Sequence, residues 1–381
     1  MRFETLPGGE AIEQPREATP DRILELDGFR ALAVWMVFAS HMMKGWPNSR
    51  ADSAWMPRWL FLILDHGWLG VDLFFILSGL LITGILIDTR DGPRYFSKFY
   101  ARRSLRILPL YLTCIVLMNW GHPGYASYFL VCLVFLQNFV FGLGIATPHG
   151  PGVFWSLAVE EHFYLIWPLL VRFVSRRAVL FSALTIVLLT PILRGIYTGK
   201  GYDIDGQIYV YSWFHFDGLA WGAVLAIWLR SRFFSRAMAH KLALGFGGAL
   251  FLITLLGYPY GILRGQTVAS GALRYTQAQC LFAALMVLSL AYSGSVYTAV
   301  LRHPFALFSA GLSYCIYLIH VVMGEVYYWG LNRLGVDEVA NFGLPGSMLA
   351  RTVAVFFLSI GVAWLSQRYL EAPFLRLKRY F

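Results

Sequence analysis

The sequence predicts an all-α fold, a polytopic membrane bundle of about ten transmembrane helices with the N- and C-termini cytoplasmic. Hydrophobic residues make up 58% of the 381 residues and charged residues only 14%. The mean hydropathy is +0.59, which leaves too little polar surface for a soluble domain of this length. In addition, apolar segments of membrane-spanning length recur along the chain, and basic residues gather between them.

Eleven apolar segments can be marked after the polar N-terminus. They lie at 28–43, 68–87, 107–121, 126–146, 154–171, 178–193, 209–229, 242–261, 277–296, 305–324 and 349–367. Helices of roughly 17–25 residues suit a bilayer, so the segments at 107–121 and 178–193 are short.

The distribution of Lys and Arg indicates which segment ends face the cytoplasm. These residues concentrate in four stretches: 90–106, 172–177, 230–241 and the residues after 367. An even number of crossings must separate the first two stretches, yet three apolar segments lie between them. One of the three should be short, re-entrant or interfacial, and we favour 107–121 or the start of 154–171. Ten crossings then place both termini in the cytoplasm.

This pattern divides the chain into a polar cytoplasmic tail (1–25), a transmembrane domain (26–370) and a basic cytoplasmic tail (371–381). The net charge of +10 comes from basic residues between apolar spans, so no nucleic-acid partner is expected. Zinc, dinucleotide and P-loop motifs do not occur, and neither a metal nor a permanently bound cofactor is expected. The four cysteines lie in apolar runs and are expected to be packing residues.

An arginine and a histidine interrupt the first apolar segment. Arg30 and His41 are eleven residues apart, so they share one helix face and lie roughly 16 Å apart along its axis. Charged residues in a membrane usually face a protein interior, because exposure to lipid is costly. His41 is a candidate general base, since imidazole titrates near neutral pH. The alternatives are an interfacial histidine beside Lys44 and an arginine that extends to the cytoplasmic headgroups.

A second group of cations follows the second apolar segment. Arg103 and Arg106 are three residues apart, so on a helix they can hold one anion between them. Guanidinium groups suit phosphate, and a cytoplasmic acyl-coenzyme A (acyl-CoA) carries several phosphates. Arg102 is assigned to the same donor-binding group. The alternative is that all three arginines only anchor the helix on the cytoplasmic side.

Two adjacent carboxylates, Glu160 and Glu161, lie in the segment that begins with Trp155 and Ser156. Such a pair in a membrane span is costly, and both carboxylates cannot face lipid. One could orient a histidine or hold a substrate hydroxyl, and a structural ion pair with an arginine is the alternative. Neither Ser156 nor Ser78 has the glycine elbow of a hydrolase nucleophile, which argues against serine-hydrolase chemistry.

Together these stretches resemble the acyltransferase 3 family, polytopic bacterial enzymes that O-acylate glycans and some small natural products. The matching motifs are Asp27-Gly28-Phe29-Arg30 with His41, Gly70-Val71-Asp72-Leu73-Phe74-Phe75, Arg102-Arg103-Ser104-Leu105-Arg106, Trp155-Ser156-Leu157 with Glu160-Glu161, Ser313-Tyr314 with His320, and Glu371-Ala372-Pro373-Phe374. The resemblance implies that Arg30 and His41 are essential and that Arg103 and Arg106 bind the acyl donor. One departure concerns Asp217: the family often has an arginine two residues earlier, where this chain has His215.

The resemblance implies an O-acyltransferase of the bacterial cytoplasmic (inner) membrane that moves an acyl group, in the first instance acetyl, from acyl-CoA to a hydroxyl. The acceptor would belong to a sugar, an exopolysaccharide or lipid-linked glycan, or a glycosylated small molecule. Arg30 would hold the donor or offset charge on the thioester oxygen. His41 would deprotonate the hydroxyl, with Glu160 or Glu161 as its orienting partner, or would carry the acyl group covalently. Substrate-contacting or structural roles are expected for Asp72, Trp155, Ser156 and His320.

Two other functions fit part of the pattern. A proton-coupled transporter or flippase would use the intramembrane Arg, His, Asp and Glu as a proton relay, although the chain lacks the strong internal repeat common in transporters. A structural subunit of a glycan assembly machine would need none of them. Tryptophans around the first outer loop would stack on sugar rings or form an aromatic belt: Trp46, Trp55, Trp59 and Trp68. No pattern specifies acyl chain length or oligomeric state.

Overall fold

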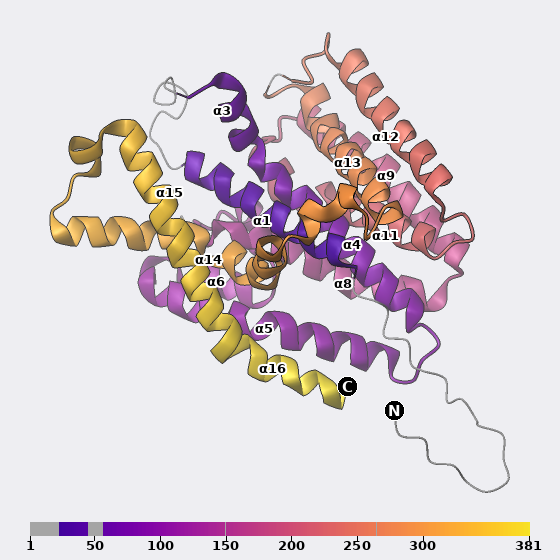
Figure 1. The fold of residues 1–381 in the computed structure, drawn as a ribbon, viewed down its shortest axis with the longest axis horizontal. Coiled ribbons are helices and arrows are strands. Elements are labelled where there is room, and N and C mark those ends of the chain that lie inside the picture. Colours follow the sequence, from indigo (N-terminus) through magenta and orange to yellow (C-terminus); the bar gives the residue numbers. More distant parts are fainter. Residues whose placement is uncertain (1–22, 45–55, 149, 264) are drawn as a thin grey trace, which may run out of the picture.

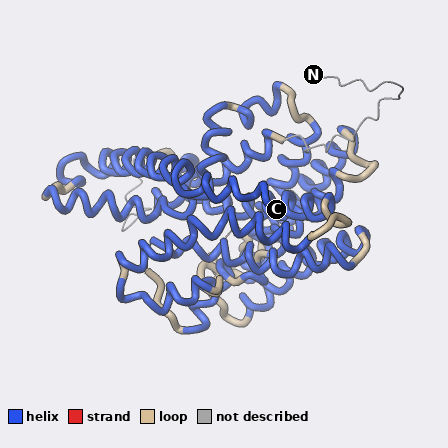
Figure 2. The backbone as a smooth tube through the Cα atoms, turned by 90° about the horizontal axis from the view of Figure 1, so that it is seen from below, coloured by secondary structure: helices blue, strands red, loops and turns tan. Residues whose placement is uncertain are grey.

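The computed structural model describes residues 23–44, 56–148, 150–263 and 265–381. All regular secondary structure in these ranges is helical, without a strand (Figure 2). This confirms the predicted all-α class. Most of the expected N-terminal tail lies outside the described residues, as do Trp46 and Trp55.

Most predicted apolar segments form a single helix. The α-helices are α1 (Leu24–Lys44), α3 (Arg58–Asp65), α4 (Gly70–Asp88), α5 (Tyr95–Gly121), α6 (Ala126–Leu133), α7 (Val140–Leu143), α8 (Trp155–Phe173), α9 (Arg176–Gly199), α10 (Gln207–Val210), α11 (Phe216–Leu229), α12 (Arg236–Gly257), α13 (Val268–Ala291), α14 (Pro304–Leu334), α15 (Glu338–Ser366) and α16 (Ala372–Arg376). Tighter or wider turns connect them: η1 (His66–Leu69), η2 (Pro123–Tyr125), η3 (Gln137–Phe139), η4 (Gly150–Phe154), η5 (Ser212–Phe214), η6 (Val296–Arg302), the π-helical η7 (Gln367–Glu371) and η8 (Leu377–Tyr380).

Within the described chain, six helices are long and apolar enough to cross a membrane. The count rises to seven if α13 and η6, which meet at a bend of 111°, form one span. Helices α1 and α8 are outside this set, because charged and polar side chains interrupt their apolar sequences. These long apolar helices support a multi-pass membrane protein, while ten crossings and cytoplasmic termini stay predictions.

Of the two segments that the sequence favoured as irregular, 107–121 is part of a candidate membrane span, whereas α8, which forms most of 154–171, is not among the candidate spans. Residues 107–121 belong to α5, a continuous helix of 27 residues that also takes in most of the basic stretch 90–106. The start of 154–171 leads directly into α8. A break falls in 126–146, which is divided among α6, η3 and α7. Residues 209–229 are likewise divided, among α10, η5 and α11.

Two buried amides explain the break at 126–146. Gln137 and Asn138 are buried, and buried amides need hydrogen-bond partners. Gln137 donates to the carbonyl oxygen of Phe154 at 2.8 Å, and Asn138 donates to the Ser212 hydroxyl at 2.8 Å. Because these partners lie on neighbouring segments, the amides hold a folded-back chain, which average hydropathy does not reveal.

The C-terminal part of the chain is more helical than predicted. Helices α14 and α15 extend beyond their predicted apolar segments, and Figure 1 shows them projecting together from one side of the bundle. The chain then continues through η7, α16 and η8. Residues 371–381 are therefore not a free tail: the main-chain oxygen of Phe381 accepts a hydrogen bond from Arg102 at 2.9 Å.

Helix α1 lies near the centre of the fold and packs against α4, α14 and η6 (Figure 1). Glu25, expected in the N-terminal tail, is instead the second residue of α1 and is only 1% exposed. Its carboxylate accepts hydrogen bonds from the Ser293 hydroxyl at 2.7 Å and the Gly294 amide at 2.8 Å. It also pairs with Arg302 at 3.3 Å. These contacts fix the N-terminal end of α1 and hence the depth of Arg30.

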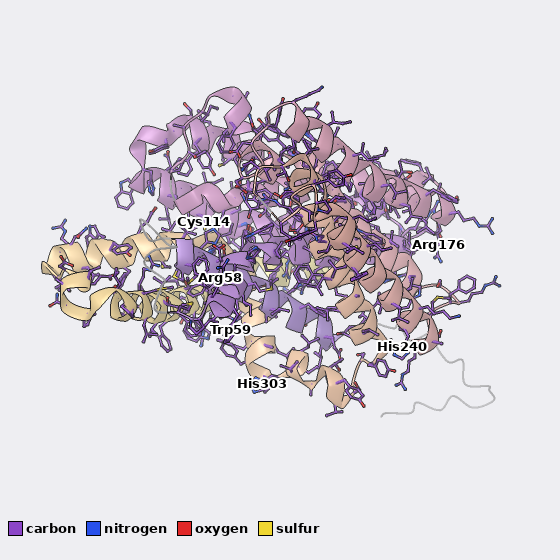
Figure 3. The ribbon with its side chains drawn as sticks, turned by 90° about the horizontal axis from the view of Figure 1, so that it is seen from above. Arg58, Trp59, Cys114, Arg176, His240 and His303 are labelled. Atoms are coloured by element: carbon purple, nitrogen blue, oxygen red, sulfur yellow. The ribbon has the colours of Figure 1, made fainter. Side chains whose placement is uncertain are left out.

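A buried ion pair joins α9 to α11. Arg194 and Asp217 are 2.7 Å apart, with side chains 0% and 1% exposed. Arg194 also donates to the carbonyl oxygen of Phe214 at 2.6 Å. Removing one member of such a pair leaves an uncompensated charge in the interior, so Asp217 is a structural group. In contrast, Arg176 and His240 are exposed at the periphery (Figure 3).

Glycines allow α4 and α11 to approach closely. A Cβ atom at Gly222 would lie 2.1 Å from the carbonyl oxygen of Ile76 and 2.4 Å from the amide nitrogen of Leu80. At Gly79, a Cβ would lie 1.9 Å from the carbonyl oxygen of Leu219. Small residues of this kind let membrane helices pack backbone against backbone. The crossing holds α4, which carries part of the candidate site, against α11.

Gly222→Ala should destabilise the protein by about 1–3 kcal/mol, because the added methyl group forces the two helices apart. The measurement is the melting temperature of the purified protein in detergent. Gly247→Ala on α12 is the matched control, since its Cβ would meet nothing within 4 Å and alanine favours a helix. Equal melting temperatures for the two variants would contradict close packing of α4 on α11.

Candidate active site

One pocket lies among α1, α4, α5, α8 and α14. It contains about 770 Å³ of space, part of it open to the outside. Its lining residues are Arg30, Val71, Phe74, Phe75, Ser78, Arg103, Arg106, Ile107, Ser156, Leu157, Glu160, Ser313, Tyr314, Tyr317 and Leu318. Five residues singled out from three separate sequence motifs thus surround one space: Arg30, Arg103, Arg106, Ser156 and Glu160.

The three arginines of the pocket differ in how their charge is balanced. Arg30 pairs with Asp27 one turn earlier on α1, at 2.9 Å. Arg103 lies 3.6 Å from Glu160, donates to the Tyr164 hydroxyl and sits 4.1 Å above the Tyr164 ring centre. Arg106 makes no hydrogen bond or ion pair with any described residue. The pocket therefore contains an excess of positive charge, with Arg106 available to an anion.

The carboxylate of Glu160 has three partners, one of which is a pocket arginine. Its carboxylate accepts hydrogen bonds from the Ser78 hydroxyl at 2.5 Å and the Tyr164 hydroxyl at 3.0 Å, in addition to the Arg103 ion pair. None of these contacts joins Glu160 to His41, so a role of Glu160 in orienting His41 stays a prediction. Glu161 does not line the pocket, and one of its buried oxygens has no hydrogen-bond partner among the described residues.

His41 contacts a second histidine, His320 on α14. Their ring centres are 4.9 Å apart. Each Nδ1 faces a carbonyl oxygen four residues earlier, at 2.9 Å for His41 and 3.0 Å for His320. This arrangement makes Nδ1 the protonated atom of a neutral ring and leaves Nε2 as the basic one. The Nε2 atom of His320 is buried and has no hydrogen-bond partner among the described residues.

Tyr317 connects the histidine pair to the pocket. It lines the pocket, and its hydroxyl lies 2.6 Å from the Ser156 hydroxyl. Its ring centre is 6.1 Å from that of His320. His41 itself is not among the lining residues. Arg30 and His41 are thus on one helix but at different places: Arg30 faces the pocket, and His41 lies beyond Tyr317 and His320.

The remaining predicted residues lie away from the pocket. Arg102 is exposed and bonds to Phe381, so its place in the donor-binding pair is not supported by the pocket geometry. Trp155 is buried, 4.8 Å from the ring centre of Tyr209. Asp72 is buried and accepts a long hydrogen bond of 3.4 Å from Gln279. These positions indicate packing or support for Trp155 and Asp72.

Sequence reasoning assigned no role in the site to several polar groups of the pocket. Ser78 lies on the α4 face that also presents Val71, Phe74 and Phe75, at helical spacing, and that periodicity could have revealed it. Tyr314 and Tyr317 share a face of α14 in the same way. The partner of Asp217 was also missed. His215 occupies the position where the family often has arginine, and Arg194 from α9 binds Asp217 in this chain.

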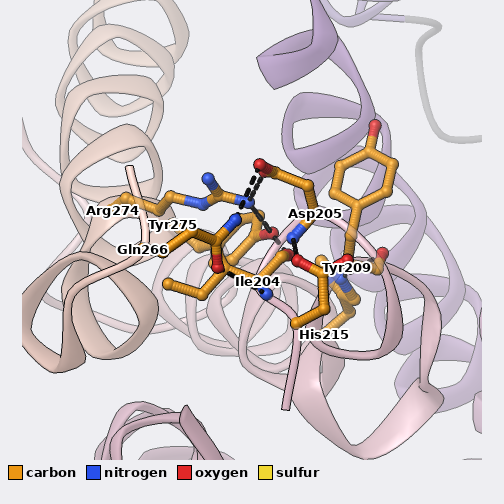
Figure 4. A network of polar contacts seen from close by, with 8 residues as sticks. Ile204, Asp205, Tyr209, His215, Gln266, Arg274 and Tyr275 are labelled. Atoms are coloured by element: carbon orange, nitrogen blue, oxygen red, sulfur yellow. Dashed lines mark hydrogen bonds and ion pairs between the residues drawn. The ribbon is translucent and has the colours of Figure 1, made fainter. Parts of the chain in front are cut away.

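A separate polar network surrounds Arg274 on α13 (Figure 4). Arg274 donates to Asp205 at 2.9 Å and to the Tyr275 hydroxyl at 2.8 Å, and it lies 5.1 Å above the ring of Trp68. Because Arg274 covers the indole of Trp68, this ring is engaged within the protein. Trp59 on α3 is 64% exposed.

A family model described as an acyltransferase domain (Acyl_transf_3) matches residues 23–368. The chain is 32% identical over 160 residues to the peptidoglycan O-acetyltransferase OatA of Listeria monocytogenes, covering 38% of this chain and 23% of that protein. It is 29% identical over 242 residues to the putative peptidoglycan O-acetyltransferase YrhL of Bacillus subtilis, covering 57% of this chain and 35% of that protein.

The chain is also 31% identical over 176 residues to the O-acetyltransferase OatA of Staphylococcus aureus, covering 42% of this chain and 26% of that protein. Each of these matches spans about a third or less of the relative's length. No solved structure matches the chain. Because the family model covers nearly all of the described residues, the chain belongs to the acyltransferase 3 family.

Proposed function

We propose that this protein is a membrane O-acetyltransferase that moves an acetyl group from acetyl-CoA to a hydroxyl of a glycan. The observation that carries the proposal is the convergence of Arg30, Arg103 and Arg106 on one pocket that is also lined by Tyr317, whose ring centre is 6.1 Å from that of His320. The arginines suit the phosphates of an acyl-CoA donor. A histidine base near Tyr317 suits the reaction at the thioester.

The donor phosphates would bind at Arg106, with Arg103 beside it. Arg106 makes no hydrogen bond or ion pair with a described residue, so it can form charge-assisted hydrogen bonds without losing an existing one. The acyl-bearing arm would enter the pocket between α1, α5 and α14. Arg30 lines that path and would stabilise negative charge developing on the thioester oxygen, a contribution typical of oxyanion-binding groups.

In the chemical step, Nε2 of His41 would remove the proton from the acceptor hydroxyl. The hydroxyl oxygen forms a bond to the thioester carbonyl carbon, the carbon–sulfur bond breaks, and the CoA thiolate takes the proton back from His41. A covalent variant, in which Nε2 of His41 first receives the acetyl group and releases CoA, uses the same atoms. Either route needs the proton to stay on Nδ1 of His41, where it is donated in a hydrogen bond to the Val37 carbonyl oxygen.

The relatives suggest the acceptor class. Two carry the name peptidoglycan O-acetyltransferase, so a cell-envelope glycan is the acceptor that we favour for this chain. Acceptor access would come from the histidine side of the pocket, opposite the arginines. The proposed location is the bacterial cytoplasmic membrane, with the basic end of α5 on the side where acyl-CoA is found.

The two arginines of α5 that line the pocket should respond differently to substitution by alanine. In Arg106→Ala the melting temperature without ligand should stay unchanged, because no described contact is lost, while stabilisation by acetyl-CoA should disappear. Arg103→Ala should also lower the melting temperature in the absence of ligand, because Glu160 loses its cation and the free energy of unfolding falls by about 2 kcal/mol. Thermal unfolding with and without acetyl-CoA measures both effects.

Wild-type stabilisation that survives in Arg106→Ala would contradict this donor site. A lower melting temperature of ligand-free Arg106→Ala would show that Arg106 has a structural role. Arg172→Ala is a suitable control for general loss of cytoplasmic charge, since Arg172 lies outside the pocket.

His41→Ala should lower acetyl transfer by about 10²–10⁴-fold, the usual contribution of a general base. Acetyl-CoA affinity should be retained, because His41 does not line the pocket. The measurements are release of CoA thiol by membranes containing the acceptor and acetyl-CoA binding by the purified variant. His66→Ala is the matched control, since His66 also bonds through Nδ1 to a carbonyl four residues earlier. Full activity of His41→Ala would exclude the mechanism.

A further inference from the structure

The last residues of the chain, beyond the segment matched by the family model, fold back onto the helix that carries Arg103 and Arg106. The family match ends at residue 368, whereas the helical chain continues through α16 and η8. Both elements contact α5, and Arg102 of α5 donates to the main-chain oxygen of Phe381 at 2.9 Å. Figure 1 shows the C-terminal end beside α5.

This arrangement gathers positive charges that do not neutralise one another. Lys98, Arg102 and Arg106 follow each other at intervals of four residues on α5, so they form a stripe of like charge, which destabilises a helix. Lys378 of η8 is half-buried, and the charges of Arg106, Arg103 and Arg102 act on it. Lys378 makes no hydrogen bond or ion pair with any described residue.

The acidic groups near this cluster are too few to balance it. Glu160 is already bound by Arg103. Glu371 exerts an attractive charge effect on Arg106 and accepts a hydrogen bond from Ser366 at 3.1 Å. Among the cations of this cluster, Glu371 thus acts on Arg106 and Arg102 bonds to the main-chain oxygen of Phe381, whereas Lys378 has no hydrogen bond or ion pair with a described residue. A cluster of this kind is stable when an anion with several charges occupies it.

We propose that Lys378 is a phosphate-binding residue of the donor site. It would bind a phosphate of the acyl-CoA nucleotide at the outer edge of the pocket, next to the phosphate held by Arg106. The inference rests on the proposed function, because it assumes that acyl-CoA is the donor. It adds to that function a binding residue from the C-terminal segment, which the family match does not include. The headgroup of an anionic lipid has the same phosphate chemistry and is distinguished by the experiment.

The test is the affinity of the full-length purified protein for CoA, measured by calorimetry in detergent. Lys378→Gln should weaken CoA binding about 5- to 10-fold, as expected for one partly exposed charge contact. Lys378→Arg should restore the affinity because it restores the charge. Arg379→Gln should leave it unchanged, since Arg379 is exposed on the same turn and bonds to the Tyr380 hydroxyl.

The outcomes separate this inference from the proposed function. Wild-type protein that fails to bind CoA would overturn both. Wild-type binding that is equally strong in Lys378→Gln would overturn the role of Lys378 and leave the proposed function standing. A Lys378→Gln variant that binds CoA normally but retains less phosphatidylglycerol through purification than wild type would assign Lys378 to a lipid headgroup. A loss of affinity that disappears when dephospho-CoA replaces CoA would place Lys378 on the 3′-phosphate.

Discussion

The ion pair between Arg103 and Glu160 is the interaction on which the rest of the site depends. Charged groups inside an apolar bundle are costly unless they are paired and hydrogen-bonded. Glu160 meets this condition through Arg103 of α5, Ser78 of α4 and Tyr164 of α8. Three helices are thereby held around one carboxylate. Because Arg103 balances Glu160, Arg106 lines the pocket without a hydrogen bond or ion pair to any described residue.

Local helix geometry made part of the site predictable. The spacing of Arg103 and Arg106 predicts a shared face, and both line the pocket, whereas Arg102 points to Phe381. Arg30 could be placed in the protein interior because a guanidinium is too costly to expose to lipid. The resemblance to the family connected these residues before their contacts were known. The catalytic role of His41 stays a prediction.

Contacts between distant segments were not predictable from the sequence. The carboxylate of Glu160 accepts a hydrogen bond from Ser78 rather than from a histidine. Asp217 forms an ion pair with Arg194 of another helix. Neither contact produces a periodic pattern in the sequence, because each depends on how the helices pack against one another. The same applies to the break in 126–146, where buried amides bind neighbouring segments. Hydropathy counts apolar residues but does not report the partners of the polar ones among them.

The central claim is that donor and acceptor groups occupy opposite ends of one site, with the donor at the basic end of α5. The most direct test adds labelled acetyl-CoA, which does not cross membranes, to sealed inverted vesicles and to sealed right-side-out vesicles from the same cells. The account predicts transfer of label to membrane glycan only in inverted vesicles, and its absence from inverted vesicles that contain Arg106→Ala. Equal transfer in sealed right-side-out vesicles would contradict the account.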